Sequence, residues 1–183
     1  MTFGNLLTYS HVEAALEKAG WQLCGQEATS QERSLLLIVE HIGDRAHDPL
    51  HHIVGIAATG GEGDPGADFP FDPKDSVATL APLFRSWLPP DTEPLDRLLG
   101  MFGDAEFLPL VKGLQRELIA ACDGDRMVCV SPHRLAGLSG TLGFAVLSQR
   151  WSAVDAGEGD VDEARQESRR AVVAITHWLD GRE

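Results

Sequence analysis

Two short apolar runs separated by a polar segment constrain the fold of this chain more than any other feature. The runs are 35–39 (Leu-Leu-Leu-Ile-Val) and 53–58 (Ile-Val-Gly-Ile-Ala-Ala), and the polar stretch 43–49 lies between them. Each run is rich in branched residues and bounded by turn formers, which predicts a β-strand. Because apolar side chains occupy successive positions, both faces of each strand are expected to be covered. The pair is therefore predicted to lie near the middle of a sheet.

Helical periodicity surrounds this pair of strands. A first helix is predicted from the capping box of Ser10 and Glu13, and Gly20 is its expected end. A last helix is predicted over residues 160–181, where apolar residues recur at spacings of three and four. Between them, residues 73–122 carry three further amphipathic segments. These segments predict a helical layer over the sheet.

Other short segments complete the predicted fold. Strands are also predicted at residues 21–28, 127–130 and 144–147. Residues 60–72 are rich in glycine and acidic side chains and are predicted to form a loop. Strands joined by short turns favour the α+β class, with an antiparallel sheet of about five strands and helices packed on it. We predict a single α+β domain over residues 1–183, with a helical arm (73–122) inserted between the two halves of the sheet and a long C-terminal amphipathic helix.

The strong negative charge of the chain excludes several classes of partner. It has 15 basic and 28 acidic residues among 183, a formal net charge of −13. This charge repels nucleic-acid phosphate and anionic lipid. No apolar run is long enough to span a bilayer, and no secretory signal is evident. The three cysteines are expected to be reduced and buried. We therefore expect a cytoplasmic protein that binds neither nucleic acid nor membranes.

A cluster of histidines supports an alternative function. Four of the seven histidines lie between residues 41 and 52. If the two central strands pair across the intervening turn, His41 lies opposite or diagonal to His51 or His52, and His47 and Asp48 in the turn add further possible ligands. The opposing interpretation, polar strand ends that face solvent, is favoured because His51 and His52 point to opposite faces of a strand. His41, His47, Asp48 and His52 remain the candidate metal site of a small metal-binding protein or metal-dependent enzyme.

Motifs for catalysis are missing from the sequence. Ser139 lies in Gly-Leu-Ser-Gly-Thr, but the second glycine comes one residue too early for a nucleophile elbow. His133 and an aspartate could complete a triad on paper, although a flexible glycine-serine loop is the favoured interpretation. The glycine-rich segment 60–72 has four acidic residues and no lysine, which makes it a poor phosphate site. We therefore predict a protein without enzymatic activity and without a cofactor.

The final helix carries the most extensive apolar stripe of the chain. A helix face that is too apolar for one neighbouring sheet can also serve as an interface. Val172, Ile175, Trp178 and Leu179 are therefore predicted to contact a partner polypeptide. An acidic rim around such a surface would suit a partner segment that is both apolar and basic. We also expect the protein to form a homodimer.

The layout resembles a known family. The helix that begins with Ser10-His11-Val12-Glu13, the three strands that follow it, and the elements from Met127 to Gly181 resemble the type III secretion chaperone fold and its YbjN-like relatives. The resemblance implies a non-enzymatic, typically dimeric protein that holds partner polypeptides in extended form. It supports a non-catalytic protein-binding module or chaperone-like adaptor. An immunity or regulatory protein that neutralises a basic partner also stays open.

Overall fold

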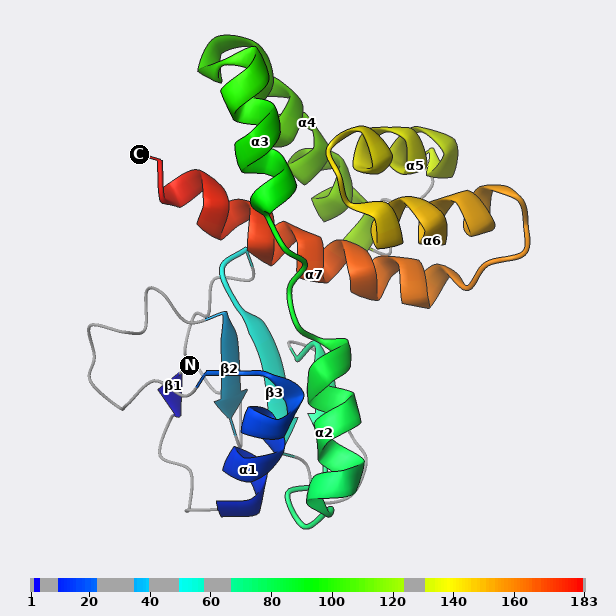
Figure 1. The fold of residues 1–183 in the computed structure, drawn as a ribbon. Coiled ribbons are helices and arrows are strands. Elements are labelled where there is room, and N and C mark those ends of the chain that lie inside the picture. Colours follow the sequence, from blue (N-terminus) through cyan, green and yellow to red (C-terminus); the bar gives the residue numbers. More distant parts are fainter. Residues whose placement is uncertain are drawn as a thin grey trace. The chain divides into compact units, whose positions relative to one another are not determined.

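The chain forms two compact units, Met1–Leu88 and Pro89–Glu183. The computed structural model describes residues 2–3, 10–22, 35–39, 50–57, 67–123 and 131–182, which together form seven helices and four strands (Figure 1). The boundary between the units falls inside the segment 73–122 that was predicted as one helical arm. The first helix of that segment belongs to the first unit, and the other two belong to the second unit.

The first unit contains a parallel sheet. Its strands are β1 (Thr2–Phe3), β2 (Leu36–Val39), β3 (Ile53–Ala57) and β4 (Phe69–Phe71). They lie side by side in sequence order, and each neighbouring pair runs parallel. The prediction of an antiparallel sheet of about five strands is therefore wrong, although helices and strands do coexist as an α+β protein requires.

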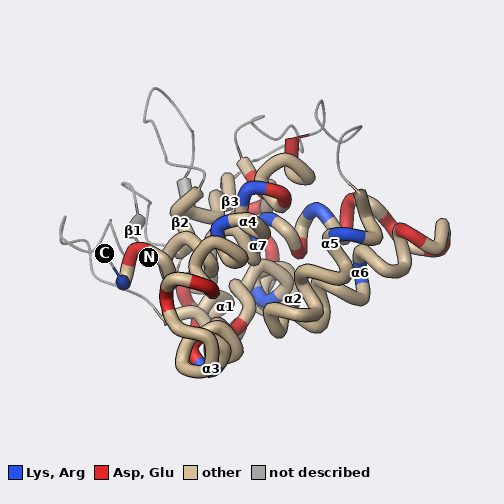
Figure 2. The backbone as a smooth tube through the Cα atoms, turned by 90° about the horizontal axis from the view of Figure 1, so that it is seen from above, with Lys and Arg blue, Asp and Glu red and all other residues tan. Residues whose placement is uncertain are grey.

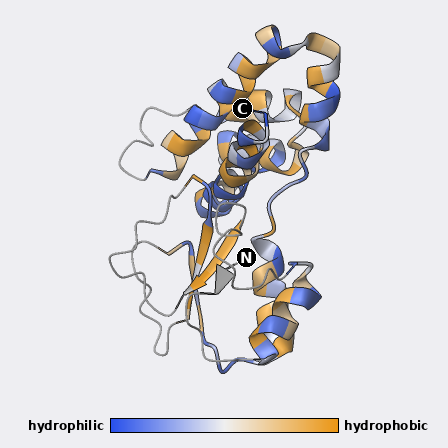
Figure 3. Ribbon diagram, turned by 90° about the vertical axis from the view of Figure 1, so that its left-hand side faces the viewer, coloured by the Kyte–Doolittle hydropathy of each residue, from blue (hydrophilic) through white to orange (hydrophobic). Residues whose placement is uncertain are grey.

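The connections between the strands explain the parallel direction. Residues 40–52 join β2 to β3, a length suited to a crossover and much longer than a tight hairpin turn. Parallel sheets are covered on both faces, so their strands consist of continuous apolar runs. The residues of β3 from Ile53 to Ile56 are all buried, as this rule requires, and Figure 3 shows β2 and β3 as apolar throughout. The predicted covering of both faces is thus confirmed, and the error lay in treating residues 43–49 as a hairpin turn.

Strand β4 lies in a segment that was predicted to be a loop. Phe69 and Phe71 are buried, whereas Pro70 between them is exposed. Proline lacks the N–H group that a central strand needs, so it is tolerated at the edge of a sheet, and β4 is an edge strand. The Phe69 ring stacks on Trp87 with centroids 5.1 Å apart, and Phe71 meets Phe84 edge-on at 5.3 Å. Aromatic packing therefore holds this short strand in place.

The other predicted strands have different outcomes. Residues 144–147 are helical apart from Phe144, which caps the helix, so the strand predicted there is wrong. Residues 127–130 lie outside the described residues, as does most of the segment 21–28. Trp21 at the start of that segment is in no strand; its indole Nε1 donates a hydrogen bond to the carbonyl of Phe84 at 2.9 Å.

Two helices of the first unit pack against each other, α1 (Ser10–Ala19) and α2 (Val77–Ser86). Helix α1 begins and ends as predicted, and Gly20, with φ +103°, follows it. Helix α2 begins at Val77, later than residue 73, where the helical arm was predicted to begin. Its N-cap is Ser76, whose side chain accepts from the Thr79 N–H, whereas Asp72 closes a turn by accepting from the Lys74 N–H at 2.8 Å.

The second unit consists of helices in its described part. They are α3 (Glu93–Phe102), α4 (Asp104–Cys122), α5 (Pro132–Thr141), α6 (Ala145–Asp155) and α7 (Val161–Asp180). Helix α7 packs against both α4 and α6, α5 packs against α6 and α4, and α3 packs against α4. The core includes Leu114, Leu118, Trp151 and Ile175, all fully buried. The long C-terminal amphipathic helix is confirmed as α7.

Charged residues of both signs are interspersed along the described helices (Figure 2). Within the described part of the chain, a helix with both the length and the apolar character needed to cross a membrane is absent.

Candidate protein-binding surface

The apolar stripe of α7 lies in the core of the second unit. Val172, Ile175 and Trp178 are buried, and Leu179 is half-buried. The Trp178 ring meets Phe107 of α4 edge-on, with centroids 6.3 Å apart. The stripe is wide because α7 has helical neighbours in α4 and in α6, and a helix that is covered on two sides needs a wider apolar face. Three of the four side chains are therefore closed to a partner in the folded chain, and Leu179 is partly accessible.

The polar edge of Trp178 is also occupied within the unit. Its indole Nε1 donates to a carboxylate oxygen of Asp96 on α3 at 2.9 Å. Arg182 forms an ion pair with the same carboxylate, and its guanidinium lies over the Trp178 ring at 4.1 Å from the centroid. These contacts attach the C-terminal end of α7 to α3. The predicted role of the four α7 residues in partner binding stays a prediction, and the folded unit does not present them as a surface.

Large apolar side chains are exposed elsewhere in the second unit. Among the described residues, four such side chains are exposed: Met101 (75%), Phe102 (58%), Leu110 (52%) and Val146 (54%). The first three lie on α3 and α4, within ten positions of one another. Single exposed apolar residues are ordinary, but several on two consecutive helices make a candidate interaction surface.

The apolar stripe of α3 leaves the core as the helix proceeds. Leu95 is fully buried, Leu98 and Leu99 are half-buried, and Phe102 is exposed, although all four lie on one face at helical spacing. Sequence periodicity placed the whole stripe in the core. The C-terminal turn of α3 therefore carries an apolar face that the unit itself leaves open.

A single glycine joins this face to α4. Gly103 has φ +75° and ψ 165°, and it is both the C-cap of α3 and the N-cap of α4. Its N–H donates to the Leu99 carbonyl at 2.8 Å, and its own carbonyl accepts from the Phe107 N–H at 3.1 Å. A Cβ atom built on Gly103 would have no neighbouring atom within 4 Å. We call Met101, Phe102, Gly103 and Leu110 together the α3–α4 tip.

The residues around the tip carry an acidic excess. Residues 91–112 hold five acidic and two basic side chains, a formal charge of −3. Arg97, one of the two basic residues, is paired with Glu93 one turn earlier on α3. Asp104 and Glu106 lie in the first turn of α4, where the helix dipole favours negative charge. The apolar side chains of the tip are therefore accompanied by acidic residues on both α3 and α4.

The carboxyl ends of the parallel strands are a second candidate location for a binding site, because ligands of open parallel sheets usually bind there. At the end of β4, Asp72 and Ser76 are engaged in the turn and the helix cap described above. His11, in the first turn of α1, contacts the carbonyl oxygen of Pro73 through Nε2. These contacts give the polar groups described at this edge a role in local structure.

The candidate metal site lies mostly outside the described residues. This applies to His41, His47 and Asp48. His52 is described and half-buried, and its ring lies beside that of His51, with centroids 6.3 Å apart. In the ranges that the structure covers, no group of three or more histidine, cysteine, aspartate or glutamate side chains is placed to hold a metal ion. The metal site stays a prediction.

The hypothetical catalytic triad with Ser139 and His133 does not form in the structure. Residues 137–141, expected to be a flexible loop, belong to helix α5. Ser139 is fully buried there, whereas the His133 side chain is 86% exposed. His133 Nδ1 lies 3.0 Å from an oxygen of Asp155 on α6, on the surface of the unit. An exposed histidine and a buried serine on one helix do not meet at a substrate.

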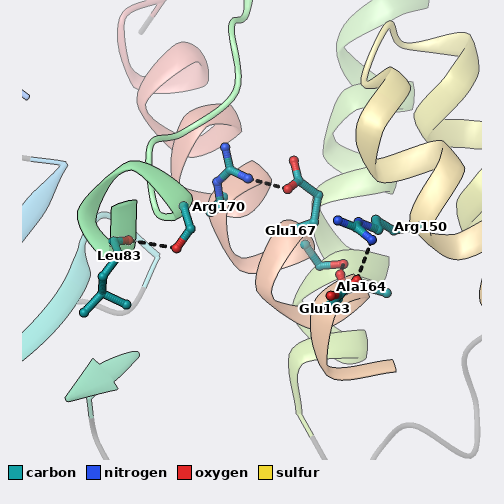
Figure 4. Close-up of polar contacts among 8 residues, drawn as sticks. Leu83, Arg150, Glu163, Ala164, Glu167 and Arg170 are labelled. Atoms are coloured by element: carbon teal, nitrogen blue, oxygen red, sulfur yellow. Dashed lines mark hydrogen bonds and ion pairs between the residues drawn. The ribbon is translucent and has the colours of Figure 1, made fainter. Parts of the chain in front are cut away.

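Other polar contacts of the second unit connect or stiffen its helices (Figure 4). Arg150 of α6 forms an ion pair with Glu163 of α7, and Glu167 pairs with Arg170 one turn along α7. Inside the core, the Trp151 indole donates to Ser168 Oγ at 2.9 Å, and that hydroxyl donates to the Ala164 carbonyl. These groups stabilise packing, which leaves the α3–α4 tip as the best candidate for a functional surface.

No protein-family model matches the sequence, and neither a curated protein nor a solved structure matches it. The resemblance to type III secretion chaperones and YbjN-like proteins therefore stays a prediction.

Proposed function

We propose that this protein is a non-catalytic protein-binding module that contacts another polypeptide through the α3–α4 tip. The observation that supports this proposal is the concentration of exposed Met101, Phe102 and Leu110 on two adjoining helices. The function is of the same class as the one implied by the chaperone resemblance. It uses a different surface from the predicted α7 residues, because the unit buries most of that stripe.

The size of the apolar contribution fits reversible binding. Complete burial of one large apolar side chain stabilises by about 1.5–3 kcal/mol relative to full exposure. Since Met101, Phe102 and Leu110 are between half and three-quarters exposed, covering all three would contribute roughly 3–5 kcal/mol. Association also costs translational and side-chain entropy. The surrounding half-buried residues of α3 must therefore take part for the complex to be stable.

A site-specific photo-crosslinker tests the proposal. The full chain would be produced with a photo-reactive phenylalanine analogue in place of Phe102, and a matched control would carry it at Val146. Both positions are exposed to a similar degree in the same unit, on α3 and α6 respectively. We expect ultraviolet light in cells to link position 102, but not position 146, to a discrete polypeptide. Equal or absent adducts at the two positions would overturn the proposal.

A further inference from the structure

We propose that the polypeptide segment that binds the α3–α4 tip is basic as well as apolar, with lysine or arginine side chains that flank its apolar ones. This inference rests on the proposed function and names the chemistry of the partner for the same surface. It is carried by the charges that accompany the exposed apolar side chains.

Two carboxylates of α4 accompany the tip without a compensating cation. Asp104 and Glu106 are exposed, and within the described part of the chain neither forms an ion pair. Glu106 lies four positions before Leu110, so the two side chains are neighbours on one face of the helix. Asp104 is separated from Phe102 by Gly103 alone. A partner that covers Leu110 therefore also meets the carboxylate of Glu106.

The basic residues nearby do not cancel these two charges. Arg97 is paired with Glu93 at 3.9 Å, and Arg182 is paired with Asp96, so both guanidinium groups already have an acidic partner. Lys112 lies two positions after the exposed leucine of α4, and residues two apart do not face each other on a helix. The uncompensated charges beside the exposed apolar side chains are therefore negative.

Apolar and charged groups have different roles in such a surface. An exposed ion pair contributes little to affinity by itself, so the apolar side chains supply most of the affinity. The carboxylates select the partner, because opposite charges are attracted and like charges are repelled across an interface. The net charge of −13 acts in the same direction over a longer range, and it accelerates the encounter with a basic segment.

Other occupants fit the charges less well. A two-fold contact between two copies would place Asp104 and Glu106 of both chains in one interface, and each chain carries −13. Nucleic-acid phosphate and anionic lipid would be repelled in the same way. A basic and apolar segment satisfies both the carboxylates and the exposed apolar side chains.

Fluorescence anisotropy with three labelled peptides tests the charge preference of the full chain. The peptides are amphipathic helices with one leucine pattern, and their polar positions are all lysine, all glutamine or all glutamate. We expect the lysine peptide to bind most tightly and the glutamate peptide to show no binding over the same concentrations. Phe102→Ser should weaken binding of the lysine peptide by about tenfold, because it removes an exposed aromatic side chain. Val146→Ser is the control on α6 and should change it less than about twofold.

A pair of double variants tests the two carboxylates. Asp104→Asn/Glu106→Gln should weaken the lysine peptide by about three- to tenfold and leave the glutamine peptide unchanged. Glu17→Gln/Glu158→Gln removes the same charge from exposed positions outside the tip, and it should change binding of the lysine peptide less than about twofold. Circular dichroism verifies that each variant is folded.

The photo-crosslinker at position 102 identifies the natural segment. Mass spectrometry of the linked peptide should give a stretch with a net positive charge and apolar residues. The yield of the adduct in cells should fall in the Asp104→Asn/Glu106→Gln background and stay the same in the Glu17→Gln/Glu158→Gln background.

Several outcomes would overturn the inference. They are a glutamate peptide that binds as tightly as the lysine peptide, a Glu17→Gln/Glu158→Gln variant as weak as Asp104→Asn/Glu106→Gln, and a linked segment that is neutral or acidic, which includes the tip of a second copy. A discrete adduct at position 102 with such a segment would leave the proposed function standing. Absence of any adduct at position 102 would remove both.

Discussion

Substituting alanine for a glycine can destabilise a protein in two ways: the backbone has a positive φ, or the added Cβ has no space. Four glycines of the second unit allow these two effects to be measured separately. Gly100 lies inside α3 with open space around it, and Gly103 has open space but φ +75°. At Gly159 a Cβ would lie 2.7 Å from the backbone nitrogen of Val154, without a positive φ. At Gly143 both effects combine, because φ is +88° and a Cβ would overlap Pro94. The four alanine variants therefore form a complete two-by-two comparison.

The expected changes in the free energy of unfolding differ in sign and size. Gly100→Ala should stabilise by about 0.5–1 kcal/mol, since alanine loses less backbone entropy in a helix. Gly103→Ala should destabilise by about 1–2 kcal/mol, the cost of a left-handed backbone for a residue with a Cβ. Gly159→Ala should cost about 1–3 kcal/mol, because its contacts are backbone atoms that do not move aside. Gly143→Ala should cost the most, roughly 2–5 kcal/mol, if the two effects add.

Urea unfolding of the full chain, followed by circular dichroism, gives these changes from the shift in midpoint at constant slope. Hydrogen exchange of the α4 and α7 amides assigns the effect to the second unit. If Gly103→Ala stabilised as much as Gly100→Ala, the positive φ of the α3–α4 link would be refuted. If Gly143→Ala cost no more than Gly103→Ala, the close approach of Pro94 would be refuted.

Two further substitutions test the packing of each unit. In the first unit, a Cβ on Gly55 would lie 2.6 Å from Phe69 and 2.8 Å from Ile38. Gly55→Ala should therefore destabilise the protein by about 1–3 kcal/mol in urea unfolding and increase hydrogen exchange of the β3 amides. A neutral result would contradict the close packing of β2, β3 and β4. In the second unit, Ser168→Ala removes the acceptor of the fully buried Trp151 indole and should cost about 1–3 kcal/mol. In a double-mutant cycle with Trp151→Phe, additive effects would argue against that hydrogen bond.

The local signals of several elements could be interpreted correctly from sequence. The capping box at Ser10, the stop at Gly20 and the N-cap at Asp160 place helix ends where the structure has them. Two continuous apolar runs also gave the central strands and their covering on both faces. These features depend on residues that are close in sequence, and their physical causes act within one or two turns or along one strand.

The sequence does contain evidence that the central strands run parallel. The runs at 35–39 and 53–58 are continuous, which is typical of parallel sheets, and the connection over residues 40–52 is long enough for a crossover. Reading the polar stretch 43–49 as a short turn predicts a hairpin and an antiparallel sheet instead. The run of apolar residues was the stronger evidence, because it reflects the burial of both faces.

The second error concerns the segment from Ser131 to Trp151. Ser131 followed by Pro132 is a helix start, since serine caps the first turn and proline fits its first position. Phe144, Leu147 and Trp151 recur at spacings of three and four and are all buried, whereas Val146 is exposed. This is helical periodicity. The prediction of a strand at 144–147 rested on a window of four residues, which is too short to distinguish the two periods.

The candidate surface could not be predicted because periodicity identifies an apolar face without identifying its neighbours. The stripe of α7 is too large for one covering layer because the helix has both α4 and α6 as neighbours. The stripe of α3 had the same spacing as a core helix, and its last turn is exposed at Phe102. What distinguishes the two stripes is how many helices surround each one, a property of the tertiary fold. A protein-binding surface on this chain is therefore to be sought where an apolar stripe extends beyond its covering helix, and the α3–α4 tip is such a place.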